Sequence, residues 1–125
     1  VRFGFVTDVL AAGEGIETML ALKSVLPDLP MIAALSANHL AALDLSPLLT
    51  RLYVARDRDA AGQMAAARLH ARGREAGIDV RDLIPAGEDF NADLCRLGAD
   101  AMLVRLAHQL APDDVVRFVR RNDAA

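Results

Sequence analysis

The sequence has little of several residue types, and each scarcity excludes a class of protein. Among 125 residues there are one cysteine, Cys95, one tyrosine and no tryptophan. A single cysteine cannot form an internal disulfide or a cysteine zinc site, so we expect a reducing, cytoplasmic location. With aromatic residues at only 4%, the chain offers few side chains on which nucleic-acid bases could stack.

The chain also has fewer basic than acidic residues. Fourteen Lys and Arg stand against 17 Asp and Glu, which gives a formal net charge of −3. Any contact with nucleic acid would therefore require a local basic patch or a partner. The longest uncharged stretch, residues 29–43, is shorter than the roughly 20 apolar residues that span a bilayer, so we expect no membrane association. The chain opens on Val1 without the features of a secretory signal, which is typical of a domain cut from a longer protein.

What is present is the apolar content of one globular domain in an alternating pattern. Hydrophobic residues make up 54% and charged residues 25% of the chain. Short apolar runs alternate with stretches that have three- and four-residue apolar spacing, which predicts an α/β fold with a parallel sheet and helices on both faces. About four strands are expected, at Val9–Ala12, Met31–Leu35, Leu52–Ala55 and Ile78–Ile84. Phe3–Asp8 is a candidate for an additional edge strand.

Helices are predicted between and after these strands, over Glu17–Leu26, part of Asn38–Leu49, Ala60–Ala76 and most of Asn91–Arg121. The third has Asp59 as its N-cap and Gly77 just beyond its end. Its predicted buried face comprises Met64, Ala65, Leu69 and Ala76. Pro112 opens a final segment with an apolar stripe formed by Val115, Val116, Phe118 and Val119. Cys95 is expected to pack as a small apolar residue.

Acidic residues fall where the predicted strands end. Glu14 follows the first strand, Asp57 and Asp59 follow the third, and Asp89 and Asp93 follow the fourth. The carboxyl ends of parallel strands meet at one edge of a sheet, so these acids should converge. Two like charges about 4 Å apart repel by roughly 4 kcal/mol at an effective dielectric near 20, so such a cluster favours a bound cation. Carboxylate oxygens without His or Cys favour Mg²⁺ or Mn²⁺, which support phosphoryl-transfer chemistry.

Three segments carry these acids, namely Ala12–Thr18 (AGEGIET), Leu52–Gly62 (LYVARDRDAAG) and Pro85–Leu94 (PAGEDFNADL). Together they resemble the motifs of the Toprim domain, most closely those of its primase-like branch in bacterial, phage and plasmid primases and primase-helicases. The resemblance covers Val9–Leu94 and implies a compact, Rossmann-like α/β fold. Residues 1–98 would form the Toprim domain, and residues 99–125 would be a C-terminal helical extension of it.

The resemblance also implies an activity, which is Mg²⁺- or Mn²⁺-dependent nucleotidyl transfer that synthesises RNA primers on single-stranded DNA. The implied partners are single-stranded DNA, nucleoside triphosphates and a helicase or other replication domains. Glu14 would be the general acid or base and a metal ligand, Asp57 and Asp59 would hold the metal, and Asp89 with Asn91 would supplement the site. Secondary ligands or phosphate and nucleic-acid contacts would come from Gly15, Glu17, Arg58, Gly62 and Asn91.

Departures from the family pattern leave alternatives open. Arg58 stands where small or amide residues are frequent, and would either contact phosphate or weaken the metal site. No zinc-binding motif is present, so the isolated domain could be inactive. The same site could instead serve a Toprim nuclease, or the chain could be a non-catalytic module that binds DNA or a partner. In structural terms alone, Glu14 could be a solvated turn residue, and Asp59 and Asp89 could be helix caps.

Overall fold

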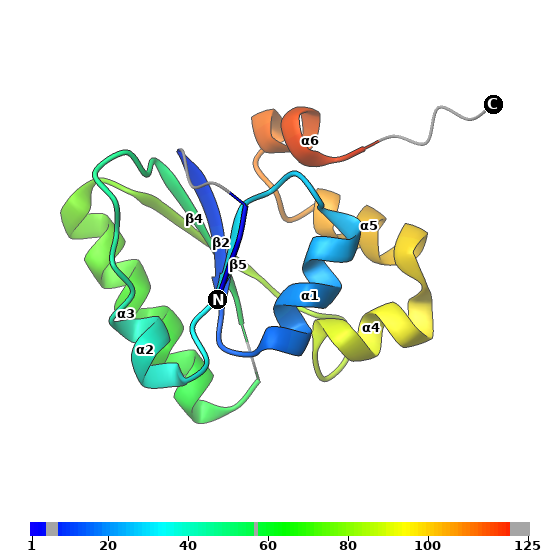
Figure 1. Cartoon of the computed structure of the whole chain (residues 1–125), viewed down its shortest axis with the longest axis horizontal. Helices are drawn as coiled ribbons and strands as arrows, with labels where there is room; N and C mark the ends of the chain where they lie inside the picture. The colour runs from blue at the N-terminus through cyan, green and yellow to red at the C-terminus, as the bar shows by residue number, and fades with distance from the viewer. Residues whose placement is uncertain (5–7, 57, 121–125) are drawn as a thin grey trace.

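Helices cover both faces of a central sheet in the computed structural model of the chain (Figure 1). The structure describes residues 1–4, 8–56 and 58–120. The sheet has five strands in the order β1-β3-β2-β4-β5. They are β1 (Arg2–Phe3), β2 (Val9–Gly13), β3 (Met31–Ala33), β4 (Arg51–Ala55) and β5 (Asp79–Leu83). β2 lies between two parallel neighbours and is buried along its whole length, which explains its unbroken apolar sequence.

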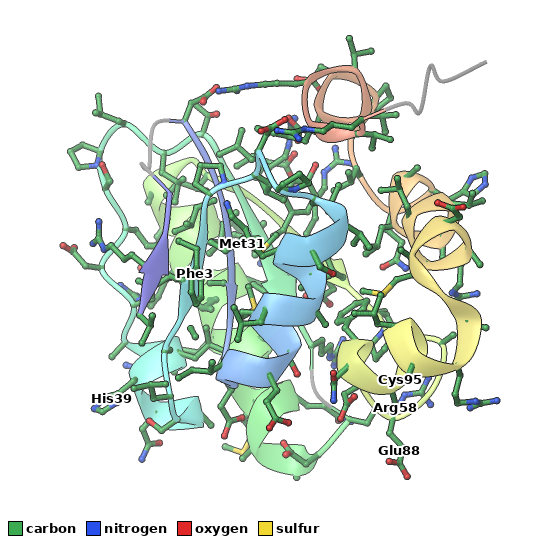
Figure 2. The ribbon with its side chains drawn as sticks, turned by 45° about the vertical axis from the view of Figure 1, so that its right-hand side comes forward. Phe3, Met31, His39, Arg58, Glu88 and Cys95 are labelled. Atoms are coloured by element: carbon green, nitrogen blue, oxygen red, sulfur yellow. The ribbon has the colours of Figure 1, made fainter. Side chains whose placement is uncertain are left out.

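The parallel arrangement predicted from the sequence is confirmed for β2 to β5. β1 is an additional strand at the edge of the sheet and is antiparallel to β3, with Phe3 opposite Met31 (Figure 2). The sheet therefore has one strand more than the four expected. β1 covers only the start of the candidate edge strand Phe3–Asp8, and residues 5–7 of that segment lie outside the described residues.

The six described helices form two layers (Figure 1). α2 (Ala37–Ala41) and α3 (Ala60–Ala76) cover one face of the sheet, and α1 (Ile16–Val25), α4 (Phe90–Leu97) and α5 (Ala99–Ala107) cover the other. α6 (Pro112–Phe118) follows them along the chain. α2 is the short helix predicted within Asn38–Leu49, and it begins one residue before that range. The long C-terminal helical region is three helices, because Gly98, with φ 83°, ends α4 and Pro112 begins α6. Cys95 on α4 is exposed rather than packed (Figure 2), so that expectation is wrong.

Small residues bring α3 close to the sheet. Its bounds and its Asp59 cap agree with the sequence prediction. Its buried residues are Gly62, Ala65, Ala66, Leu69 and Gly73. A side chain at Gly73 could not fit, because a Cβ there would lie 2.2 Å from Cγ2 of Val80. Met64 is 74% exposed and Ala76 is exposed as well, so the prediction that these two residues are buried is wrong.

α6 closes the end of the sheet where the strands begin, opposite the ends where they stop (Figure 1). The Tyr53 hydroxyl donates to Oδ2 of the buried Asp114 and accepts from the backbone N–H of Ala111 at 2.9 Å. Arg51 donates to the same carboxylate oxygen at 3.0 Å. Phe118 is buried in the core, whereas Val116, expected in the apolar stripe, is 87% exposed. Because α6 packs where the strands begin, it does not cover the loops at their carboxyl ends.

Within the described ranges, no helix is both long enough and apolar enough to cross a membrane.

Candidate functional site

Three acidic residues line one hollow at the carboxyl end of the sheet. Glu14 directly follows β2, Glu17 lies in the first turn of α1, and Asp59 precedes α3. The hollow has a volume of about 440 Å³. Its remaining lining residues are Gly15, Ile16, Thr18 and Leu35. The order of the strands thus brings together acids that are up to 45 positions apart in the sequence.

Close packing fixes the turn that carries Glu14. A Cβ on Gly13 would lie 2.5 Å from Sδ of Met19 and 3.1 Å from Cβ of Ala55. A side chain at position 13 would have to displace Met19 and crowd Ala55, and glycine avoids both. The turn ends at Gly15, whose carbonyl accepts the N–H of Met19 at 3.1 Å and starts α1. Glu14 is held half-buried at a defined position.

The loop after β3 is fastened to the same turn. The backbone N–H of Ala34 donates to the Gly13 carbonyl at 2.8 Å, and that of Leu35 donates to the Glu14 carbonyl at 2.7 Å. Leu35 has φ 76°, a conformation that a leucine rarely adopts, and it is 58% exposed at the rim of the hollow. Strained, exposed residues of this kind occur where the surrounding contacts dictate the backbone. Sequence reasoning missed Leu35 because its positive φ has no local sequence signal.

Asp59 has a structural role beside its place in the hollow. Its Oδ1 accepts the backbone N–H of Gly62 at 2.6 Å, which caps α3. A carboxylate has two oxygens, so capping and metal binding are compatible. Gly62 is itself buried in the first turn of α3, where its N–H is the donor to the capping carboxylate. Asp57, the predicted companion of Asp59, lies outside the described residues.

The third acidic segment mainly stabilises its own loop. Asp89 caps α4, with Oδ1 accepting the N–H of Ala92 at 2.7 Å. Asp93 is 3% exposed and accepts the N–H groups of Ala86 at 2.7 Å and Gly87 at 2.8 Å. Neither residue is among those that line the acidic hollow, and neither is the exposed Asn91. The contacts of Asp89 are those of a helix cap, and the contacts of Asp93 are those of a residue that stabilises a turn.

Arg58 joins two loops at this end of the sheet. Its Nη2 donates to the carbonyl oxygens of Pro85 at 3.1 Å and Ala86 at 3.3 Å. Figure 2 shows Arg58 beside the chain that enters α4. The side chain thus holds the loop after β4 against the loop after β5, a role that neither sequence alternative for Arg58 contained.

The side chains in the hollow suit a hard divalent cation. All three ionisable groups are carboxylates, which are the ligands that Mg²⁺ and Mn²⁺ prefer. Among the described residues, which leave out position 57, no three His, Cys, Asp or Glu side chains are placed to hold a metal ion. The donor set fits a metal by its chemistry, and Asp57 is the further acid that the sequence offers between Asp59 and β4.

Comparisons with known proteins agree with this arrangement. The Toprim domain family matches residues 9–100, which include β2 to β5 and the acids Glu14, Glu17, Asp59, Asp89 and Asp93. No curated protein matches the sequence. Among solved structures, the chain is similar to a DNA primase domain from Pseudomonas aeruginosa, with 28% sequence identity and a TM-score of 0.56. That match covers 82% of this chain and 33% of the primase domain, so the chain spans about a third of that protein's length. The family match extends over most of the sequence, and the protein therefore belongs to the Toprim domain family, with a primase-like Toprim fold.

Proposed function

We propose that the chain is the Toprim catalytic domain of a primase-like DNA replication protein. Its reaction would be Mg²⁺-dependent nucleotidyl transfer, which synthesises RNA primers on single-stranded DNA from nucleoside triphosphates. The observation that carries the proposal is the hollow that Glu14, Glu17 and Asp59 line at the carboxyl end of the sheet. The likeness to a primase domain supports it. Further replication domains, such as a helicase, would supply the rest of the reaction.

Each residue has a proposed part in this chemistry. Glu14, Asp57 and Asp59 would hold the metal, with Asp89 as a supplementary ligand and Glu17 as a secondary one. When bound, the metal would polarise the phosphate and neutralise charge on the incoming triphosphate. Glu14 would move the proton of the attacking 3′-hydroxyl. Gly15 and Asn91 would contact nucleic acid or phosphate, and Gly62 and Arg58 would act by fixing the cap and the loops.

The first test is a calorimetric titration of Mg²⁺ and Mn²⁺ into the chain and its variants. Asp59→Asn is the informative substitution because asparagine caps helices as well as aspartate does. We expect Asp59→Asn and Asp57→Asn each to bind the metal at least roughly tenfold more weakly. Loss of one carboxylate ligand should cost more than about 1.4 kcal/mol of binding free energy. Glu75→Gln, an exposed acid on α3, is the matched control for the charge change. Equal metal affinity in Asp59→Asn and Glu75→Gln would contradict the proposed site.

The second test separates the proposed reaction from its alternatives. The longer parent protein is incubated with single-stranded template, ribonucleotides and Mg²⁺. Extended products support primer synthesis, whereas shortened template indicates a nuclease that uses the same site. If the unaltered parent shows no phosphoryl transfer with Mg²⁺ or Mn²⁺, and its DNA binding survives Glu14→Gln, the chain is instead a non-catalytic module.

A further inference from the structure

A second surface, outside the acidic hollow, lies between α3 and the edge strand β5. It consists of two adjoining hollows, of about 360 Å³ and about 400 Å³, which share Arg56. The first also contains His70, Arg74 and Asp82, and the second contains Arg58. We call this surface the α3–β5 groove. The described residues that line it include none of the proposed metal ligands.

The α3–β5 groove is positively charged in a chain whose net charge is −3. Among the described residues that line it, three are arginines, Arg56, Arg58 and Arg74, and one is an acid, Asp82. Asp82 holds Arg56 Nη1 at 3.0 Å and His70 Nε2 at 2.8 Å, so it orients these side chains while neutralising only one charge. A guanidinium has five N–H donors, and Arg58 uses one nitrogen for the two loop carbonyls. The groove can therefore offer several donors to an anion.

The shape of the groove favours a strand over a small anion. Arg74 lies in the last turn of α3 and Arg58 directly before its cap, so the arginines span about 22 Å of helix, which is several nucleotides. Exposed alanines, Ala67 and Ala71, line the groove between them and leave room for a sugar–phosphate chain. At one end, Arg58 precedes Asp59, which lines the acidic hollow. The groove thus leads along α3 to the proposed site of chemistry.

We propose that the α3–β5 groove binds the sugar–phosphate backbone of single-stranded DNA and leads the strand toward the acidic hollow. This inference rests on the proposed function for the identity of the strand as template, but the contact itself requires no metal. It provides the local basic patch that an acidic chain needs to hold nucleic acid. None of the described residues that line the groove is aromatic, so binding would depend on phosphates and would show little base preference.

The test measures the affinity of the 125-residue chain for a fluorescein-labelled oligothymidine. Fluorescence anisotropy reports the binding, and EDTA removes any metal. Arg74→Ala should weaken binding by about fivefold or more, and should reduce the dependence of affinity on salt by about 0.7 in the logarithmic slope. Arg68→Ala is the matched control, because Arg68 lies about 120° away around the same helix and lines a different hollow, against α2.

A second pair of variants adds charge without touching an arginine. Ala67→Glu places a carboxylate in the groove and should weaken binding at least as much as Arg74→Ala. Met64→Glu adds the same charge on the α2 side of α3, where Met64 is 74% exposed, and should leave affinity within about twofold of the unaltered chain. Thermal melts monitored by circular dichroism verify that all four variants are folded.

Three results would overturn the proposal. One is equal weakening by Arg74→Ala and Arg68→Ala, which indicates attraction to net charge alone. Another is the absence of oligothymidine binding at low salt. The third is displacement of the oligothymidine by inorganic triphosphate beyond the effect of ionic strength, which would make the groove a nucleotide site. Because the oligothymidine assay is done in EDTA and the metal titration without DNA, failure of the groove and failure of the proposed metal site are distinguishable.

Discussion

Leu35 combines an unfavourable backbone conformation with an exposed side chain. Its φ of 76° costs a non-glycine residue about 1–2 kcal/mol, while glycine adds about 0.5–1 kcal/mol of unfolded-state entropy. Because the side chain is 58% exposed, little burial is lost on truncation. We therefore predict that Leu35→Gly leaves the free energy of unfolding unchanged or raises it by up to about 1 kcal/mol, as measured by urea denaturation.

Leu48→Gly is the control for this prediction. Leu48 is 70% exposed and has no positive φ, so glycine there should lower the free energy of unfolding by about 0.5–1 kcal/mol. Equal losses in Leu35→Gly and Leu48→Gly would mean that Leu35 is not strained. The conformation could not be predicted from the sequence because hydrogen bonds between two loops impose it, through the Leu35 N–H and the Glu14 carbonyl.

Asp59 allows its structural role to be separated from its proposed chemical one. Asp59→Ala removes the hydrogen bond to the Gly62 N–H and should lower the free energy of unfolding by about 1 kcal/mol. Asp59→Asn keeps a side-chain acceptor and should change it by only a few tenths of a kcal/mol. Urea denaturation in EDTA measures both variants without a metal contribution. If Asp59→Asn is as unstable as Asp59→Ala, the cap interpretation is wrong.

The caps of α3 were predictable from the sequence because their chemistry is local. Asp59 and Gly77 act on backbone groups within a few positions of themselves, and both bounds of α3 were predicted to the residue. The buried face of the same helix was not, because it depends on the distance to the sheet. Gly62 and Gly73 are buried because they are small enough to fit where α3 lies close to the sheet. The spacing of hydrophobic residues instead predicts that Met64 is buried, whereas it is exposed.

The attachment of α6 to β4 depends on a hydroxyl that must stay protonated. Burial and the hydrogen bond to Asp114 raise the pKa of the Tyr53 phenol well above its usual value of about 10. A raised folded-state pKa means that the contribution to stability is complete below the unfolded-state pKa and is lost as pH rises through the folded-state value. We therefore predict that the free energy of unfolding falls above about pH 10 through this group.

Tyr53 is the only tyrosine and the chain has no tryptophan, so its ionisation can be followed directly by near-ultraviolet absorbance. Tyrosinate should form only as the circular dichroism signal is lost. Tyr53→Phe should lower the free energy of unfolding near neutral pH by about 1–3 kcal/mol, because Asp114 and the Ala111 N–H lose a partner. It should also flatten the decline above pH 10. Asp113→Ala, which alters an exposed contact of Arg51, serves as the control.

The strands and loops differ in how well the sequence predicts them. Strands β2 and β4 were predicted within a residue or two because buried apolar runs define them. β1 is only two residues long, and its pairing with β3 depends on a partner far along the chain. Among the site residues, Glu14 and Asp59 meet because the strand order requires it, whereas the contacts of Arg58 with Pro85 and Ala86 depend on loop geometry.

At the scale of the whole molecule, the C-terminal helices share a core with the strands that support the site. Phe118 of α6 is 3% exposed and belongs to the same buried cluster as Val9, Ala11 and the α1 residue Leu22. α5 adds Met102 to that cluster. Because one cluster spans these elements, we expect α5 and α6 to unfold together with the preceding Toprim residues.

This expectation predicts the behaviour of two variants on the same helix. Phe118→Ala removes a buried ring and should lower the free energy of unfolding of the whole chain by about 3–5 kcal/mol, with a single transition. Val116→Ala is the control, since Val116 is 87% exposed and its loss should cost less than about 0.5 kcal/mol. Urea unfolding is followed by circular dichroism and by the absorbance of Tyr53, which lies on β4 at the base of α6. If Phe118→Ala separates the two curves, α6 unfolds alone and forms a unit apart from the domain that carries Glu14 and Asp59.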